Sequence, residues 1–357
     1  MYECVSIHII YLSFAKENKM KKILYFILIS LFSLTFISCA KEDDKEESDN
    51  SSSSSTSSSS SSSSSVFLAV GASGTLLTSP DGTTWTSRTS GTSNNLRSFA
   101  FDGNRTGVVV GFSGTILSST DGITWTPRTS GTSKNINNVA YGNSKFIAVG
   151  DNGTTLYSSD GITWTDWTSN CGANDNESLW DVAYGSSTWV AVGDNGSIYT
   201  SDESSCTKRT SGTTVEFNEL YYGNSTFVAL GDNGTILSST DGITWTARTS
   251  GTTDSLYSGT YVNSNYVAVG AWGNLLTASD ATSTWTSNRT YTQDATSTTS
   301  VNTHLYGIAY GNSIWVMVGQ SGNIYNTSDG TISTSMVVTS RTSGTTESLR
   351  RVFYVGE

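Results

Sequence analysis

The chain has 357 residues and a formal net charge of −11, with 34 glycines and only 2 prolines. Serine and threonine dominate its polar residues, so the folded part is predicted to consist of short strands joined by tight turns instead of helices. The acidic balance and the absence of a basic tract argue against nucleic acid as a partner.

Residues 1–39 form a predicted signal-peptide region. Met20-Lys21-Lys22 and the apolar run Ile23 to Ile37 supply a charged head and an apolar core of signal-peptide length, which favours Met20 over Met1 as the start. Phe36-Ile37-Ser38-Cys39 resembles a bacterial lipobox, in which a signal peptidase cuts before a cysteine that becomes diacylated. The alternative is a transmembrane anchor, although the run is short for a span of about 20 residues.

Residues 40–65 form a predicted acidic and polyserine linker. Lys41-Glu42-Asp43-Asp44 resembles the surface-export signal of some Bacteroidetes-type lipoproteins, and Ser51 to Ser65 is serine except for Thr56. Such a composition cannot bury a core and behaves as a flexible tether with a root-mean-square reach of about 25–30 Å. We therefore expect an outer-membrane lipoprotein that faces either the periplasm or the cell surface.

Residues 66–357 contain seven copies of one repeat. Its clearest form, Ser118-Ser119-Thr120-Asp121-Gly122-Ile123-Thr124-Trp125, has close copies ending at Trp85, Trp164 and Trp245 and degraded copies around Asp202, Asp280 and Asp329. A glycine that follows valine or a similar residue recurs every 38 to 49 residues, at Gly71, Gly111, Gly150, Gly193, Gly231, Gly270 and Gly319. Self-similarity at this period is typical of repeat architectures.

Each repeat is predicted to contain four strands, named a to d. In the third repeat they span Ile136 to Tyr141, Lys145 to Gly150, Thr154 to Ser158 and Ile162 to Thr168. Asn152-Gly153 between b and c is a preferred hairpin turn, because both central residues want positive φ. Four strands in about 40 residues are typical of a propeller blade.

The two ends of the repeat region predict how the ring closes. Val66 to Gly71 is a strand b with no strand a before it, and Leu349 to Tyr354 is a strand a with no strand b after it. If the last strand completes the first blade, the fold is an all-β, seven-bladed β-propeller without exposed sheet edges.

The repeated Ser-X-Asp-Gly-X-Thr-Trp motif resembles the Asp-box, or BNR repeat, of the sialidase-like propeller superfamily, with one residue fewer between aspartate and glycine. The pattern over Val66 to Glu357 is most similar to the photosystem II assembly-factor type of seven-bladed propeller. This resemblance implies that the aspartates tie each c–d hairpin to its own amides and that the tryptophans pack between sheets. The residues concerned are Asp81, Asp121, Asp160, Asp241, Trp85, Trp125, Trp164 and Trp245. No metal is expected, since each turn offers one carboxylate and calcium takes six to eight oxygens.

Positions that vary among otherwise equal repeats are candidates for function. The second and third residues of strand a vary, and they are predicted to lie near the mouth of the central channel, on the face of the d–a crossovers and b–c turns. The ligand-binding candidates there are Arg97, Trp180, Asp181, Glu219, Tyr257, Tyr306, Arg350 and Arg351. Aromatic faces beside convergent polar groups suit a sugar or a peptide. The alternative is a solvated mouth with no ligand.

A sialidase-like glycosidase is the rival hypothesis. The resemblance would assign Arg97, Arg350 and Arg351 to a substrate carboxylate, Tyr257 with Glu219 to the nucleophile pair, and Asp181 to the acid. These arginines cluster in two neighbouring repeats, however, and His304 is the only histidine in the mature chain. No phosphate loop or nucleophile elbow is present, so no cofactor is expected.

The sequence therefore favours a non-catalytic, monomeric binding protein for a protein or glycan partner. An envelope assembly or scaffold factor is a further alternative to the sialidase.

Two further residue sets have expected structural roles. Cys171 follows strand d of one repeat and Cys206 replaces the tryptophan of the next, which predicts an extracytoplasmic disulfide or, alternatively, two free thiols. The strand-d arginines are expected to be structural partners for a neighbouring blade, the alternative being a ring for an anionic partner. They are Arg88, Arg128, Arg209, Arg248 and Arg341, with Arg289 at the matching place.

Overall fold

The computed structural model describes residues 65–171, 177–293, 298–327 and 335–356. The expected signal peptide, lipobox and nearly all of the tether lie outside these residues. Within the described ranges, no helix combines the length and hydropathy needed to cross a membrane.

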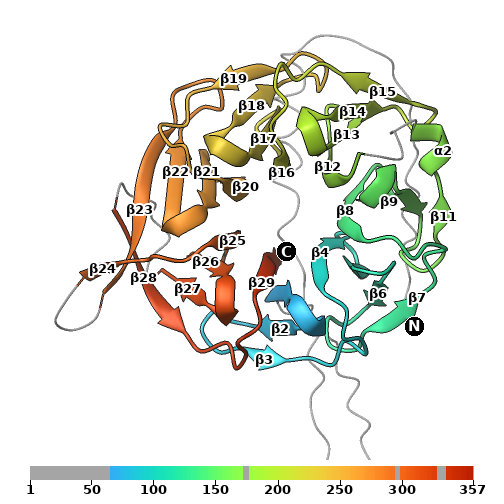
Figure 1. Ribbon diagram of the computed structural model, residues 1–357. Coiled ribbons are helices and arrows are strands. Elements are labelled where there is room, and N and C mark those ends of the chain that lie inside the picture. The colour runs from blue at the N-terminus through green and yellow to red at the C-terminus, as the bar shows by residue number, and fades with distance from the viewer. Residues whose placement is uncertain (1–64, 172–176, 294–297, 328–334, 357) are drawn as a thin grey trace, which may run out of the picture. The chain divides into compact units, whose positions relative to one another are not determined.

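Seven blades of four strands each surround a central opening (Figure 1). We number these blades 1 to 7 from the one that contains β1. The strands are β1 (Val66–Gly71), β2 (Leu76–Ser79), β3 (Thr86–Ser87), β4 (Leu96–Phe101), β5 (Gly107–Gly111), β6 (Ile116–Ser119), β7 (Thr126–Arg128), β8 (Ile136–Gly142), β9 (Lys145–Gly150), β10 (Thr155–Ser158), β11 (Thr165–Asp166), β12 (Leu179–Gly185), β13 (Thr188–Gly193), β14 (Ile198–Ser201), β15 (Cys206–Arg209), β16 (Phe217–Gly223), β17 (Thr226–Gly231), β18 (Ile236–Ser239), β19 (Thr246–Arg248), β20 (Leu256–Val262), β21 (Asn265–Gly270), β22 (Asn274–Ala278), β23 (Thr286–Gln293), β24 (Thr298–Ser300), β25 (Leu305–Gly311), β26 (Ile314–Gly319), β27 (Ile324–Asn326), β28 (Ser335–Arg341) and β29 (Leu349–Val355). A short helix, α2 (Thr168–Cys171), follows β11, and a 3-10 turn lies between strands b and c in every blade except blade 2.

The ring closes as predicted. β29 pairs antiparallel with β1, with Leu68 opposite Phe353 and Ala69 opposite Val352. Blade 1 therefore has the strand order β29-β1-β2-β3 and combines the two ends of the repeat region.

Blades 6 and 7 share one sheet of nine strands, which the sequence did not predict. Their outermost strands, β23 and β28, pair in parallel, and β24 adds to β23. Both outer strands are longer than those of the other blades, which gives them enough backbone to meet.

The predicted bounds hold for the inner strands and fail for strand d. In blade 3, β9 has the predicted bounds, and β8 and β10 differ from prediction by one residue. Strand d was predicted to span residues 162–168, but β11 covers only Thr165–Asp166. The reason is that the N–H groups of Ile162 and Thr163 donate to the Asp160 side chain at 2.8 Å and are part of the turn.

The c–d turns use one chemistry in four blades. Oδ1 of Asp160 accepts those two amides and the hydroxyl of Ser158 at 3.0 Å. These hydrogen bonds, from Thr163 and then Ile162, lower the pKa of Asp160. Gly161 has a φ of +69°, and a Cβ there would lie 2.8 Å from the Val108 side chain of the preceding blade. The same aspartate contacts recur at Asp81, Asp121 and Asp241.

The hydrophobic core lies between blades. Trp125 of blade 2 is 7% exposed and packs in a cluster with Leu68 and Leu76 of blade 1 and with Phe99 of its own blade. Trp85, Trp164 and Trp245 occupy equivalent clusters. Each repeated indole thus buries apolar surface between its own sheet and the preceding one.

The strand-d arginines bind within the scaffold. Arg128 Nε donates to Ser118 Oγ at 2.7 Å on strand c of the same blade, and Arg248 makes the same contact. The expected structural role is therefore observed. The Nε partner lies in the arginine's own blade, and Arg248 Nη1 also donates to the Thr282 carbonyl oxygen of the next blade at 3.3 Å. The side chain of Arg289 is outside the described residues, as is that of Cys171. Cys206 is disulfide-bonded, and its pairing with Cys171 stays a prediction.

Candidate functional site

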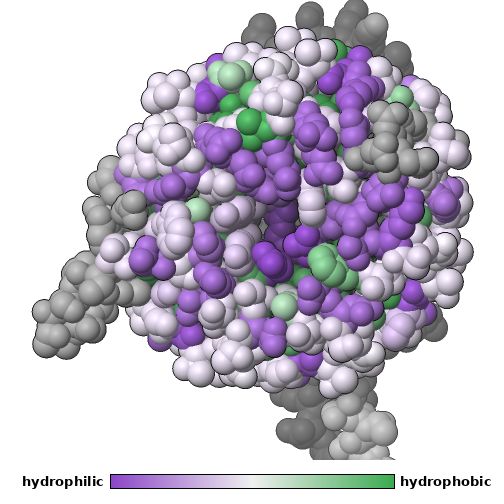
Figure 2. Space-filling view, viewed as in Figure 1, coloured by the Kyte–Doolittle hydropathy of each residue, from purple (hydrophilic) through white to green (hydrophobic). Residues whose placement is uncertain are grey.

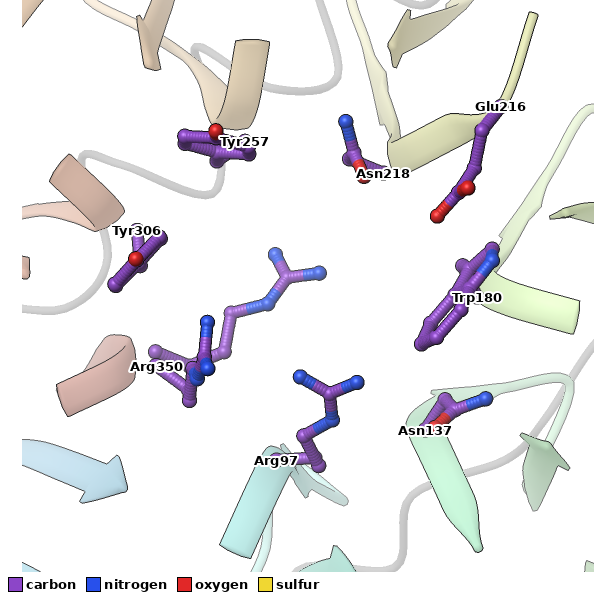
Figure 3. Close-up of a pocket in the computed structure, with 9 residues that line it drawn as sticks. Arg97, Asn137, Trp180, Glu216, Asn218, Tyr257, Tyr306 and Arg350 are labelled. Carbon is purple, nitrogen blue, oxygen red and sulfur yellow. The ribbon is translucent and has the colours of Figure 1, made fainter. Parts of the chain in front are cut away.

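A polar pocket occupies one mouth of the central channel. Figure 2 shows hydrophilic side chains gathered around a hollow on this face. The pocket has a volume of about 290 Å³. The second residue of strand a from every blade lines it, together with Glu216 and Arg351. These seven residues are Arg97, Asn137, Trp180, Asn218, Tyr257, Tyr306 and Arg350 (Figure 3).

A β-bulge in each innermost strand accounts for this ring of side chains. In blade 2, Gly111 pairs with Leu96 and Val110 with Ser98, so Arg97 has no partner in the ladder. Such a bulge re-aims the extra side chain. The repeated glycine is required here, because a Cβ on Gly111 would lie 2.2 Å from the carbonyl oxygen of Asn95. The same register shift occurs in all seven blades.

Two arginines form the cationic wall of the pocket. The Arg97 guanidinium lies 4.9 Å from the Phe112 ring and 5.3 Å from the Trp180 ring, and that of Arg350 lies 4.5 Å from the Tyr306 ring. Burial, followed by the charge of Arg350, lowers the pKa of Arg97 to about 10. Arg97 therefore stays charged at neutral pH. Within the described residues, neither guanidinium has an ion-pair partner.

The opposite wall is acidic. In blades 3 to 5 the b–c turn begins with aspartate, which holds the second residue of strand a. The contacts are Asn137 to Asp151 at 2.9 Å, Trp180 to Asp194 at 2.6 Å and Asn218 to Asp232 at 2.9 Å. Burial, followed by Asp194 and Asp232, raises the pKa of Glu216 on the same wall.

Aromatic rings fill the wall contributed by blades 6 and 7. Tyr257 and Tyr306 have ring centroids 5.3 Å apart, and His304 lies 4.6 Å from Trp272. Trp272 is 48% exposed and has a φ of +57°, where several other blades have asparagine. A bulky residue with positive φ is a strained outlier, and such strain is most often kept at functional sites.

A buried ion cluster closes the pocket from below. Arg351 extends from blade 1 to blades 4 and 5, where its Nη2 lies 2.8 Å from Asp181 Oδ2 and its Nη1 pairs with Glu219. Burial raises the pKa of Glu219 well above its ordinary value against the opposing effect of Arg351, and the neighbouring Asp181 adds to the rise. A second cavity of about 320 Å³ lies on the other side of these residues. The Arg351–Asp181–Glu219 cluster thus divides the channel.

The structure places six of the eight predicted ligand-binding residues in the pocket lining. Asp181 and Glu219 are instead buried in the cluster with Arg351. Sequence reasoning placed Asn137 and Asn218 near the mouth without choosing them as ligand-binding residues, and it missed Glu216. The sequence did contain a signal for Asn137 and Asn218. The aspartates that bind them belong to Asp-Asn-Gly turns between strands b and c, and this turn sequence occurs in blades 3 to 5 only.

The sialidase-like roles are not assembled in this geometry. They would require Arg351 to hold a substrate carboxylate while Asp181 and Glu219 act on the sugar. Here the three side chains bind one another.

This closed ring of seven blades with a polar mouth defines a seven-bladed β-propeller protein. No protein-family model matches the chain, and no curated protein matches its sequence. The fold does resemble solved structures. YCF48 bound to a D1 peptide aligns with a TM-score of 0.56 and 19% identity, over 72% of this chain and 88% of that chain.

Two further structures show the same fold. YCF48 from Cyanidioschyzon merolae aligns with a TM-score of 0.51 and 17% identity, over 66% of this chain and 82% of that one. The WD40 propeller domain of Doa1 aligns with a TM-score of 0.56 and 15% identity, over 71% and 85%. The predicted likeness to the photosystem II assembly-factor type of propeller is confirmed at the level of the fold.

Proposed function

We propose that this protein is a non-catalytic binding protein that holds an anionic segment of a partner protein in the mouth pocket. The observation that carries the proposal is that the arginines at the mouth differ in whether they have a carboxylate partner. Arg351 is neutralised by two buried carboxylates, whereas Arg97 and Arg350 face the pocket without an ion pair among the described residues. A carboxylate in the pocket would relieve the repulsion between these two cations and accept charge-assisted hydrogen bonds from them.

The walls of the pocket suit a peptide. Tyr257 and Tyr306 offer apolar faces, while the Glu216 carboxyl group offers a hydrogen-bond acceptor. A peptide has a neutral amide backbone, apolar side chains and a carboxylate, so each wall has a counterpart. A YCF48 structure contains a bound D1 peptide, which supports a peptide ligand for this fold.

Replacing Arg350 with alanine should weaken peptide binding by about 10- to 100-fold, because a hydrogen bond to a charged group contributes about 1.5–3 kcal/mol. The measurement is retention of the full chain, in mild detergent, on an immobilised library of acidic and neutral peptides, followed by titration of each retained peptide. Arg97→Ala combined with Arg350→Ala should abolish retention.

Arg105→Ala is the matched control, since it removes the same charge from an exposed turn at the other end of the channel. Equal peptide affinities for the wild-type chain and the double arginine variant would refute the pocket assignment.

We further propose that Cys39 carries a lipid that anchors the chain to the outer membrane, with residues 40–65 as the tether. The lipobox-like Phe36-Ile37-Ser38-Cys39 supports this proposal. Radiolabelled palmitate should enter the wild-type chain and the Cys4→Ser control, but not Cys39→Ser. Full labelling of Cys39→Ser would show that the anchor lies elsewhere.

A further inference from the structure

The outer edge of blade 3 lacks the arginine–hydroxyl pair that joins strands d and c in blades 1, 2, 4 and 5. Trp167 stands at the place of the strand-d arginine, and Tyr157 stands at the place of its hydroxyl partner on strand c. In blade 2 the corresponding residues are Arg128 and Ser118, joined by a hydrogen bond. The rings of Tyr157 and Trp167 have centroids 6.5 Å apart and meet at 79°, so they form an aromatic corner.

The adjoining edge of blade 4 departs from the repeat as well. Cys206 replaces the tryptophan that fills the interblade space in five of the other blades, as Trp125 does in blade 2. Glu203 occupies the c–d turn position of Gly122 and keeps its positive φ, +74°. A residue with a side chain is disfavoured in this conformation. Four repeated positions are thus replaced on the two sides of a single interface.

Three of these replacements, Tyr157, Trp167 and Glu203, line a cavity of about 300 Å³, which we call the rim site. Its volume is at the lower end of the range for small-ligand pockets. The lining includes Lys145, Tyr157, Thr165, Asp166, Trp167 and Glu203. Residues of the mouth pocket do not contribute to it.

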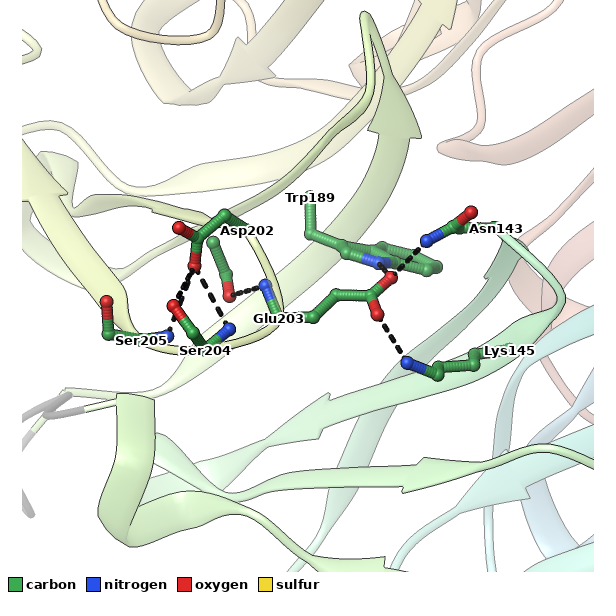
Figure 4. A network of polar contacts seen from close by, with 8 residues as sticks. Asn143, Lys145, Trp189, Asp202, Glu203, Ser204 and Ser205 are labelled. Atoms are coloured by element: carbon green, nitrogen blue, oxygen red, sulfur yellow. Dashed lines mark hydrogen bonds and ion pairs between the residues drawn. The ribbon is translucent and has the colours of Figure 1, made fainter.

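The polar side of the rim site is preorganised. Glu203 pairs with Lys145 and accepts hydrogen bonds from Asn143 Nδ2 at 2.6 Å and Trp189 Nε1 at 3.4 Å (Figure 4). Hydrogen bonds from Lys145 and then Asn143 lower the pKa of Glu203. The ion pair neutralises the lysine, and the exposed Asp166 adds a negative charge. The site therefore has no excess positive charge for an anion.

We propose that the rim site binds a neutral pyranose unit of a glycan. A pyranose ring has a face of C–H groups that packs on an indole or phenol ring, and its edge carries hydroxyl groups. The aromatic corner of Tyr157 and Trp167 suits the face. The carboxylates of Asp166 and Glu203, the ammonium of Lys145 and the hydroxyl of Thr165 suit the edge. This inference goes beyond the proposed function, since it concerns a different site and a different ligand.

The test uses the full chain and an array of neutral glycans with terminal glucose, galactose, mannose or N-acetylglucosamine. The wild-type chain should be retained by at least one of them. Tyr157→Ser combined with Trp167→Arg should reduce the affinity for that glycan at least tenfold without lowering the melting temperature. The reason is that this double variant recreates the serine–arginine pair found in blade 2.

Two single variants complete the test. Glu203→Gly restores the repeat glycine, relieves the strain of the positive φ and removes the ion pair with Lys145. It should therefore also weaken glycan binding, and it provides an independent test of the rim site if the double variant fails to fold. Arg350→Ala should leave glycan binding unchanged, which separates the rim site from the mouth pocket. The proposal is overturned if the wild-type chain retains no neutral glycan, if it retains only anionic ones, or if the Tyr157 and Trp167 changes leave the affinity intact.

Discussion

Replacing Arg351 with methionine should lower the free energy of unfolding by about 3–5 kcal/mol, because it leaves two buried carboxyl groups without a cation. Asp181 and Glu219 are 3% and 4% exposed. Asp181 also accepts backbone hydrogen bonds from Val182 at 2.7 Å and Leu220 at 3.1 Å, so it is held in place. Urea denaturation of the full chain measures the loss.

Two variants serve as controls for this prediction. Arg351→Lys keeps the positive charge but loses the fork that reaches both carboxylates, so its loss should be smaller. Arg97→Met makes the same chemical change at a neighbouring position without an ion pair, and it should cost about 1 kcal/mol through lost ring contacts. Equal stability of Arg351→Met and Arg97→Met would show that the cluster is not a structural clamp.

The pH dependence of stability should report on Glu219. Its folded pKa is raised by burial above the ordinary value of 4.5, so the folded state binds this proton more tightly than the unfolded state. The corresponding stabilisation is complete below about pH 4.5 and is lost as the pH rises through the folded pKa. Wild type should therefore lose stability relative to Glu219→Gln as the pH rises from 4.5. Parallel stability curves for the two proteins would contradict the raised pKa.

Ending the chain after Ser348 should abolish cooperative unfolding of the propeller. The truncation removes β29, which exposes the edge of β1 and opens two core clusters. Leu349 is fully buried and Val352 is 3% exposed, in the cluster shared by blades 7 and 1. Phe353 packs against the cluster shared by blades 1 and 2. An open ring also has unpaired backbone groups that favour aggregation.

Thermal denaturation followed by circular dichroism, together with size-exclusion chromatography, measures this effect. A chain ending after Val355 keeps the whole of β29 and should melt like the wild type. Adding a peptide of residues 349–357 to the shorter chain should restore part of the transition. A cooperative melt of that chain near the wild-type temperature would mean that the ring does not depend on β29.

The features that sequence analysis predicted well depend on short-range chemistry. Strand b of blade 3 has the predicted bounds because it is an apolar run between turn residues. Asn152 and Gly153 have the expected positive φ values of 55° and 67°. The aspartate turns are equally local, since Asp160 binds residues only two and three positions away. Both ends of strand d were wrong, because the aspartate turn delays its start to Thr165 and helix α2 begins at Thr168, just after the strand ends at Asp166.

Taken alone, the amino-acid sequence settles the number of blades, the partner of the last strand and the identity of the side chains near the mouth, since a repeat aligns equivalent positions. The folded chain decides what those side chains contact. Arg351 and Asp181 are 170 residues apart and meet only because the ring is narrow enough for one side chain to reach across it. The repeat pattern cannot encode that distance, nor the bulge that turns Arg97 into the pocket, because both depend on how blades pack around a common axis.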